Sequence, residues 1–95
     1  MKTRWTRRAL RQFIHAQDYI AQENPVAAQA IARHVLDAVD LLLIQPGIGR
    51  VGRIEGTREW PVKQTPYLLA YRHEADTIQI LAVIHSKQRW PDALN

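Results

Sequence analysis

The 95-residue sequence contains no cysteine. A disulfide framework and a thiolate metal site are therefore excluded, and the chain is compatible with a reducing cytoplasm. No apolar run approaches the ~18 residues of a membrane span, and the basic opening from Met1 to Arg11 is not followed by an apolar stretch of signal-peptide length. We expect a bacterial cytoplasmic protein without a membrane association.

Motifs of cofactor-dependent and nucleophilic enzymes are missing as well. The sequence has no P-loop, dinucleotide fingerprint, nucleophile elbow or zinc motif. His15, His34 and His73 share no short spacing of the kind that holds a metal ion. The sequence thus predicts neither a cofactor nor a metal site.

What the sequence does contain is enough apolar residues for one core and an excess of basic residues. Hydrophobic residues make up 46% of the chain and fall into patterned runs, which predicts one globular domain over residues 1–95. Thirteen lysines and arginines outweigh nine aspartates and glutamates, for a formal charge of +4. This excess predicts attraction to nucleic acid, to an acidic protein segment or to a nucleic-acid enzyme.

The first half of the chain predicts a short strand and a helical hairpin. Lys2 to Trp5 is extended in character, and Thr6 can cap a helix from Arg7 to Gln22. Six apolar residues give this helix one packed face: Leu10, Phe13, Ile14, Ala16, Ile20 and Ala21. Asn24-Pro25 then starts a second helix that runs to about Ile44. Its apolar stripe comprises Ala28, Ile31, Ala32, Val35, Val39 and Leu42.

The second half predicts three strands. Pro46-Gly47-Ile48-Gly49 ends the helical region, because proline cannot continue a helix and glycine permits unusual backbone angles. A basic loop from Arg50 to Gly56 precedes strands at Thr57 to Val62, Tyr67 to His73 and Thr77 to His85. Pro61 lacks a backbone donor, which favours a bulge or a sheet edge at that position.

Alternation in the last strand divides it into two faces. Ile78, Ile80, Ala82 and Ile84 share one face, which should meet the helices, while Gln79, Leu81, Val83 and His85 share the other. We therefore expect an α+β fold in the order strand, helix, helix, strand, strand, strand, with the hairpin packed on one face of a small, mostly antiparallel sheet. The opposite face should be open, and the end from Asp92 to Asn95 should fray.

Candidate functional residues gather in the sheet half. The basic ones are Arg53, Arg58, Lys63, Arg72, His85, Lys87 and Arg89. Arg72 and His85 should lie on the face away from the helices, where the group could form a basic concave surface that binds phosphates. The alternative is ordinary solvated charges with local partners such as Glu55 and Glu59.

His85 and the aromatic residues allow two interpretations each. Imidazole can act as an acid or base near neutral pH, so His85 is a catalytic candidate, but a hydrogen-bonded structural histidine fits equally well. The aromatic residues could stack on bases or pack the sheet, and packing is favoured for Trp60, Tyr67 and Tyr71. Trp90 with Pro91 follows the last strand, where it is expected to cover the sheet edge.

The order of short motifs resembles the RelE/ParE toxins over nearly the whole chain. In the first half these are Arg4-Trp5-Thr6 with Ala9-Leu10, Asp18-Tyr19-Ile20-Ala21 and Asn24-Pro25. In the second half they are Pro46-Gly47-Ile48-Gly49-Arg50, Gly56-Thr57-Arg58-Glu59, Pro66-Tyr67-Leu68-Leu69-Ala70-Tyr71-Arg72 and Ile84-His85 with Arg89-Trp90-Pro91. The resemblance implies the toxin of a type II toxin–antitoxin system, held silent by an antitoxin with an acidic or partly disordered segment.

The family implies two alternative targets. A RelE-like toxin cleaves mRNA on the translating ribosome, for which Arg72, His85 and Arg89 are the candidates. This chain, however, lacks a lysine pair in the first strand after the helices and any tyrosine after residue 71. A ParE-like toxin is not an enzyme but acts on DNA gyrase, arrests growth and stabilises plasmids.

The Gly56–Glu59 segment and the ending from His85 to Pro91 resemble the ParE branch more closely, so a ParE-like toxin is the expectation. Its residues for binding the target or the antitoxin are expected to be Arg53, Arg58, Lys63, Arg72, His85, Lys87, Arg89 and Trp90.

Overall fold

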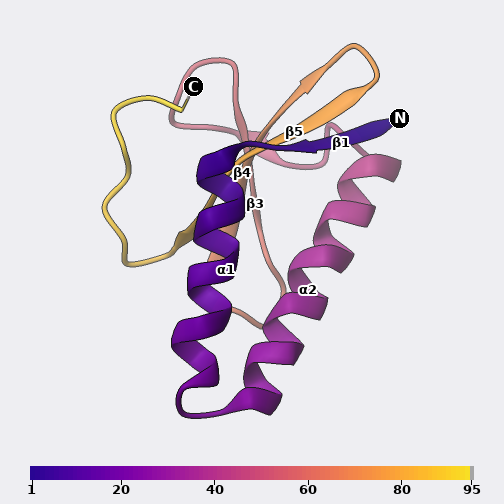
Figure 1. Cartoon of the computed structure of the whole chain (residues 1–95). Helices are drawn as coiled ribbons and strands as arrows, with labels where there is room; N and C mark the ends of the chain where they lie inside the picture. The colour runs from indigo at the N-terminus through magenta and orange to yellow at the C-terminus, as the bar shows by residue number, and fades with distance from the viewer. Residues whose placement is uncertain (95) are drawn as a thin grey trace.

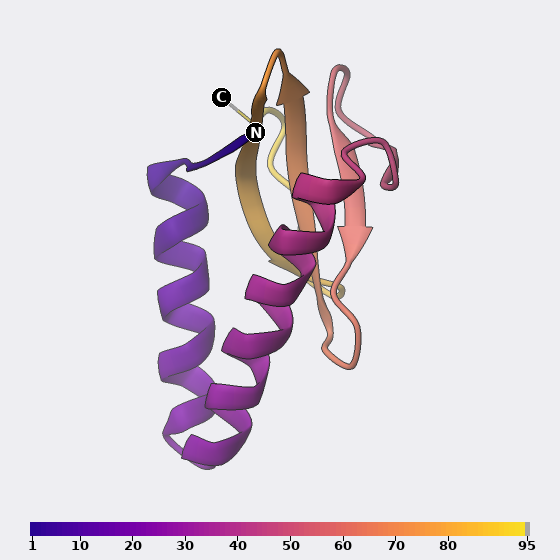
Figure 2. The same ribbon diagram turned by 90° about the vertical axis from the view of Figure 1, so that its right-hand side faces the viewer.

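A computed structural model describes residues 1–94 and has two helices on one face of a five-stranded sheet (Figure 1, Figure 2). The elements are β1 (Lys2–Trp5), α1 (Arg7–Ala21), α2 (Pro25–Ile44), β2 (Arg50–Val51), β3 (Arg58–Pro61), β4 (Tyr67–Glu74) and β5 (Thr77–His85). The predicted fold class and the placement of the helices on one face are confirmed.

Both predicted helix caps are present. The side-chain oxygen of Thr6 accepts a hydrogen bond from the backbone N–H of Ala9 at 3.1 Å, and that of Asn24 accepts one from Ala27 at 3.0 Å. The helix α2 has the predicted bounds, and α1 ends one residue earlier than predicted. Within residues 1–94, neither helix is long and apolar enough to cross a membrane.

The sheet has the strand order β1-β5-β4-β3-β2 and is antiparallel except where β1 runs parallel to β5. The strand β2 lies in the segment that was predicted to be a loop. It was not predicted as a strand because two residues are too few to show an alternation of apolar and polar side chains. It pairs with Arg58 and Glu59 but not with Trp60 or Pro61. The predicted edge position of Pro61 is therefore confirmed.

A β-bulge in β5 corrects the predicted division of that strand into faces. Tyr71 pairs with Ile80 and Ala70 pairs with Ala82, which leaves Leu81 as an extra residue. Ile78 and Ile80 pack in the core beneath the helices as predicted, whereas Ala82 and Ile84 belong to a cluster on the other face. One inserted residue reverses the alternation that follows, so His85 lies on the helix side.

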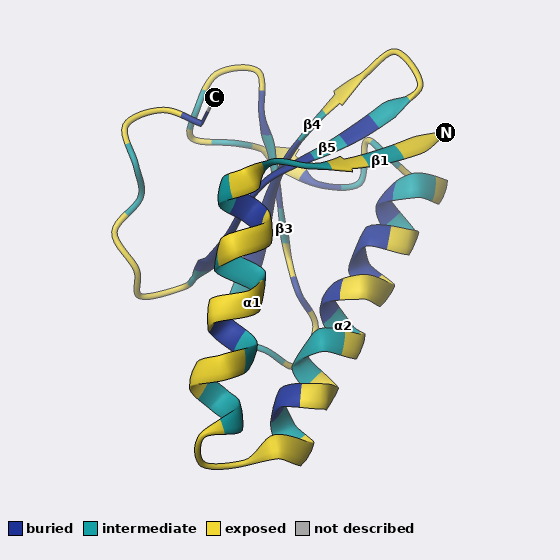
Figure 3. Cartoon of the chain, in the orientation of Figure 1, coloured by how far each residue is buried: buried dark blue, intermediate teal, exposed yellow. Residues whose placement is uncertain are grey.

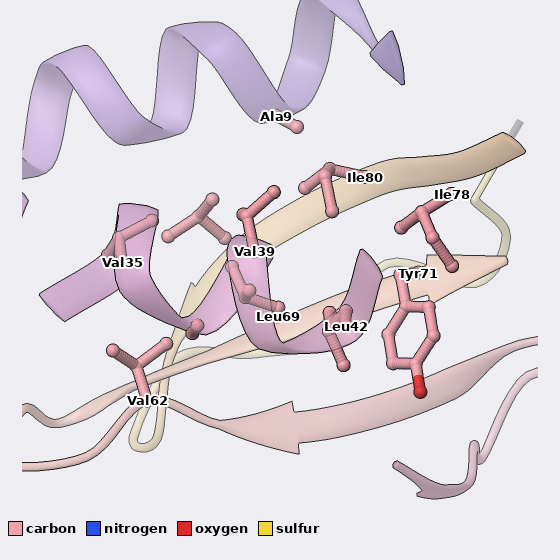
Figure 4. Close-up of a cluster of buried hydrophobic side chains, with 11 residues drawn as sticks. Ala9, Val35, Val39, Leu42, Val62, Leu69, Tyr71, Ile78 and Ile80 are labelled. Atoms are coloured by element: carbon pink, nitrogen blue, oxygen red, sulfur yellow. The ribbon is translucent and has the colours of Figure 1, made fainter. Parts of the chain in front are cut away.

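The main core lies between the sheet and the inner sides of the two helices (Figure 3, Figure 4). Figure 4 shows Val35, Val39 and Leu42 of α2 together with Leu69 and Tyr71 of β4 in this cluster. The fully buried residues of α1 are Ala9 and Ala16. Leu10 and Ile14, predicted to be packed, are each 48% exposed. The residues that α1 buries most fully are thus two small alanines, while Phe13 packs against the core partly buried.

The C-terminal segment covers the other face of the sheet. Leu94 is 2% exposed and packs in a second cluster with Ala70, Leu81, Ala82 and Ile84, against which Ile54 and Trp90 also lie. Arg8 holds this segment by donating a hydrogen bond to the carbonyl of Ala93 at 3.0 Å. The predictions of an open face and of fraying from Asp92 onward are therefore wrong for the described residues. Asn95 lies outside them.

Candidate functional site

The predicted catalytic candidates Arg72 and His85 are not brought together. Arg72 pairs with Gln79 near the turn between β4 and β5, whereas His85 pairs with Tyr67 at the opposite end of this hairpin. The two pairs lie five positions apart along β4, or about 17 Å at roughly 3.3 Å per residue. The bulge also places them on opposite faces, so the expectation that both face away from the helices is wrong for His85.

The residues of the predicted basic surface are dispersed over the molecule. Arg72 forms an ion pair with Glu74 at 3.6 Å. Lys63 lines a cavity of about 350 Å³ between α2 and β3, together with His34 and Asp37. Lys87 and Arg89 are exposed in the segment after β5 and form no ion pair with a residue that the structure describes.

Glu59 binds two arginines, and we name Arg50, Arg53 and Glu59 the Glu59 cluster. The Glu59 side chain is 2% exposed. Its carboxylate accepts hydrogen bonds from Arg50 Nη2 at 3.0 Å, from Arg53 Nε at 3.1 Å and from the Arg53 backbone N–H at 2.8 Å. The guanidinium of Arg53 also lies 3.8 Å from the centre of the Trp90 ring, a cation–π contact. The cluster thus fastens the C-terminal segment to the loop before β3.

The electrostatics of this cluster favour the ionised carboxylate. Burial of the Glu59 carboxyl group raises its pKa, but hydrogen bonds from Arg53 and Arg50 and the charge of Arg53 lower it. The net pKa lies below its usual value of 4.5. The interpretation of Arg53 as a charge with a local carboxylate partner therefore fits the structure.

A second set of contacts fastens the loop after α2. The Tyr71 hydroxyl donates to the Pro46 carbonyl at 2.7 Å and accepts from the Gly49 N–H at 3.0 Å. Arg58 Nη1 donates to the Gly49 carbonyl at 2.7 Å. Burial raises the pKa of Tyr71 above 10.0, although the bond from Gly49 and the charge of Arg58 lower it. Tyr71 is therefore a packing residue, as predicted, and Arg58 is bound to main-chain carbonyls.

The prediction that the two glycines of this loop adopt unusual backbone angles is wrong, and Gly49 serves another purpose. Gly56 is the glycine with positive φ among the described residues, at 79°, so Gly47 and Gly49 need no unusual backbone angle. A Cβ atom at Gly49 would instead lie 2.6 Å from the Tyr71 hydroxyl oxygen. Gly49 is thus required because the tyrosine ring comes so close to the backbone.

A cavity of about 520 Å³ opens where α1 faces the end of the β4–β5 hairpin, and we name it the His85 cavity. It is lined by Arg11, Gln12, His15, Ala16, Tyr19, Tyr67, Val83, His85 and Gln88. None of these residues carries a carboxylate. The α1 residues were missed in the sequence, although Arg11, His15 and Tyr19 recur at four-residue spacing, which places them on one side of a helix.

The polar groups of the cavity are held in defined positions. The Tyr67 and His85 rings meet edge to face, with centres 5.3 Å apart. The His85 Nδ1 accepts the N–H of Lys87 at 3.1 Å, so the proton of the neutral ring lies on Nε2. Burial, and to a smaller extent Tyr19, raises the pKa of Tyr67 above 10.0. Residues 1–94 contain no cluster of three or more potential metal ligands. The cavity offers hydrogen-bond donors and aromatic walls.

Comparison with known proteins gives three findings. Residues 3–90 match the family described as ParE toxin of type II toxin-antitoxin system, parDE. The toxin candidate Y4kP of Sinorhizobium fredii is 41% identical over 93 residues, which cover 98% of this chain and 96% of the relative. Toxin RelE2 of Caulobacter vibrioides is 33% identical over 82 residues, which cover 86% of this chain and 91% of the relative.

A solved structure has the same fold. The structure described as the chromosomal ParDE TA system from P. aeruginosa superposes with a TM-score of 0.80 over 90% of this chain and 95% of that chain. The two sequences are 24% identical. This likeness concerns the fold alone.

Proposed function

The chain belongs to the ParE toxin family of type II toxin–antitoxin systems, and we propose that it arrests bacterial growth by inhibiting DNA gyrase until a cognate antitoxin neutralises it. In this proposal the chain is a binding protein without a reaction of its own. Its partners are gyrase when it is free and the antitoxin when it is silent.

The separation of Arg72 from His85 is the observation that carries the proposal. An RNA-cleaving site needs a base at the ribose hydroxyl and cations at the same scissile phosphate, all within hydrogen-bonding reach. Two groups about 17 Å apart on opposite faces cannot serve one phosphate. The geometry therefore favours the ParE-like activity over the RelE-like one.

Lys87 and Arg89 are the residues that we assign to the gyrase contact. The backbone around them is fixed at both ends. The Lys87 N–H donates a hydrogen bond to His85, and the Trp90 ring contacts the Arg53 guanidinium. Both side chains are exposed. Because gyrase holds anionic DNA, exposed basic side chains on the toxin attract and orient it. The fastened backbone holds these two charges at a defined place, which reduces the entropy lost on binding.

The test compares the two possible targets directly. Purified protein is added to gyrase with relaxed plasmid and, in parallel, to ribosomes translating a defined message. We expect loss of supercoiling, intact message and recovery of supercoiling when the antitoxin is added. Cleaved message together with undisturbed supercoiling would overturn the proposal in favour of a ribosome-dependent endoribonuclease.

A further inference from the structure

The amide and imidazole side chains of the His85 cavity have their acceptor atoms occupied by the main chain. Gln12 Oε1 accepts the N–H of Val83 at 2.8 Å, and Gln88 Oε1 accepts the N–H of His85 at 3.2 Å. His85 Nδ1 in turn accepts the N–H of Lys87 at 3.1 Å. Three backbone donors therefore fix the orientation of three lining side chains.

The groups that remain on these three side chains are N–H donors. A glutamine whose oxygen is engaged offers the two hydrogens of its Nε2, and a neutral imidazole whose Nδ1 is engaged offers its Nε2–H. Arg11 adds a guanidinium, which has donors only, and it forms no ion pair with a residue among 1–94. Since no lining residue carries a carboxylate, the cavity is matched to a ligand rich in acceptors and negative charge.

The size and the apolar lining of the cavity suit a ring beside the anionic group. Ala16 and Val83 line it with buried side chains, and the Tyr67 ring meets the His85 ring edge to face at 5.3 Å. Tyr19 lines it as well and is 65% exposed. The volume of about 520 Å³ lies within the range of about 300–1,000 Å³ that is usual for small-molecule sites. A bare phosphate ion would leave most of this space empty.

The cavity between α2 and β3 shows no such match. It also contains basic side chains, those of His34 and Lys63, but Asp37 lines it too. A carboxylate in the lining repels an anion and attracts the neighbouring cations itself. The volume of this cavity, about 350 Å³, is smaller as well. An anionic ligand is therefore expected in the His85 cavity and not in this one.

We propose that the His85 cavity binds a nucleotide with a terminal phosphate monoester. Arg11 and the remaining amide N–H groups bind the phosphate oxygens, and Tyr19 and Tyr67 contact the base. A terminal phosphate has three acceptor oxygens and close to two negative charges, so it uses more of these donors than a carboxylate does. The main-chain bonds of the two glutamines stay in place, because the ligand uses the other end of each amide. Binding of this ligand does not require that gyrase be the target of the toxin.

The first test titrates the full chain with adenosine 5′-monophosphate (AMP) and follows the amide signals by NMR. Adenosine, which lacks the phosphate, and ribose 5-phosphate, which lacks the base, are the companion probes. We expect AMP to bind at least about tenfold more tightly than either, with shifts centred on the amides of Val83 and His85. Equal binding of AMP and ribose 5-phosphate, or shifts that avoid these two amides, would overturn the site.

A charge variant separates the cavity from the net charge of +4, which attracts any phosphate. Arg11→Gln removes one guanidinium from the cavity at an exposed position, and we expect it to weaken AMP binding by about tenfold. Arg33→Gln is the matched control, because Arg33 is exposed on α2 and lines neither cavity. Equal losses in the two variants would show attraction by net charge alone and overturn the proposal.

An aromatic variant tests the contact with the base. Tyr19→Ala removes an exposed ring, so the fold is retained, and we expect AMP to bind about fivefold more weakly or worse. Binding of ribose 5-phosphate, which has no base, should stay unchanged. An equal loss for the two probes would contradict a contact between Tyr19 and the base.

A last comparison distinguishes the two sources of a terminal phosphate, a free nucleotide and the end of a nucleic-acid strand. A short oligoadenylate with a 5′ phosphate is titrated beside the same strand with a 5′ hydroxyl. Binding of the phosphorylated strand at least as tight as that of AMP identifies a strand end as the ligand, and tighter binding of AMP identifies the free nucleotide. Both results support the site. Equal binding of the two strands, together with no preference for AMP over adenosine, would overturn it.

Discussion

Two groups of basic residues differ in what their charges already bind. Arg50, Arg53 and Arg58 are bonded to a buried carboxylate or to loop carbonyls. Lys87 and Arg89 are exposed, with no ion pair to a residue among 1–94. The net charge of +4 counts all five alike. The difference teaches that, of these five residues, Lys87 and Arg89 are the two whose side chains are free to act on an anionic partner, while the other three hold loops in place.

The two groups should also respond differently to perturbation. Removing a partner from the first group leaves charges without their hydrogen bonds, so it costs folding free energy. Changing the second group alters only a field around an exposed segment, which salt screens over about 8–10 Å. Stability and activity should therefore separate along this division.

The largest effect on stability is expected from Glu59→Ala. It removes the carboxylate that accepts bonds from Arg50 and Arg53 and loosens the contact of Arg53 with Trp90. We expect a loss of about 3 kcal/mol in the free energy of unfolding, measured by urea denaturation. Glu55→Ala, at an exposed position of the loop before β3, is the control. An equal effect of both substitutions would contradict a special role for Glu59.

The same carboxylate should make stability depend on pH. Because the folded-state pKa of Glu59 is below its usual value of 4.5, the ionised form favours folding. Its contribution is fully present above pH 4.5 and is lost as the pH falls through the lower folded-state pKa. Urea titrations in this acidic range should give a steeper loss of stability for wild type than for Glu59→Gln. Parallel curves would show that Glu59 does not cause the dependence.

A smaller loss is expected from Tyr71→Phe. The substitution keeps the buried ring but removes the bonds to Pro46 and Gly49, which should cost about 1–2 kcal/mol. Thermal unfolding monitored by circular dichroism provides the measurement. Tyr19→Phe is the control, because Tyr19 is 65% exposed. A melting temperature unchanged by Tyr71→Phe would mean that the hydroxyl does not fasten the loop.

Almost no change in stability is expected from Arg72→Ala, since its partner Glu74 is exposed and their ion pair is 3.6 Å long. Growth arrest on induction should persist as well, because the proposed activity needs no catalytic arginine. The ribosome-dependent alternative predicts instead that Arg72→Ala and His85→Ala each lose toxicity while antitoxin binding is preserved. Plating cells after induction of each variant separates the two mechanisms.

Local signals in the sequence predicted most elements, and non-local contacts explain the failures. Thr6 and Asn24-Pro25 marked both helix starts because capping is a property of a few neighbouring residues. The bulge at Leu81 carries no such signal, and it reversed the predicted environment of His85. The burial of Leu94 depends on a sheet face built by residues far away in the sequence.

The candidate site was less predictable than the fold for the same reason. The sequence identified the basic and aromatic residues but not their partners. Glu59 was considered only as an ordinary counter-ion, and its near-complete burial follows from the placement of β3 beneath the loop that carries Arg53. The His85 cavity combines α1 with the end of a hairpin in the second half of the chain, so no local pattern could reveal it.

The most direct test measures gyrase inhibition and stability on one variant. In Lys87→Glu/Arg89→Glu the two exposed charges after β5 are reversed, while Arg33→Glu reverses an exposed charge on α2 as the control. We predict that the double variant inhibits supercoiling at least about tenfold less than wild type, with a free energy of unfolding unchanged within about 0.5 kcal/mol. Full inhibition by the double variant would contradict the assignment of activity to the unpaired basic residues.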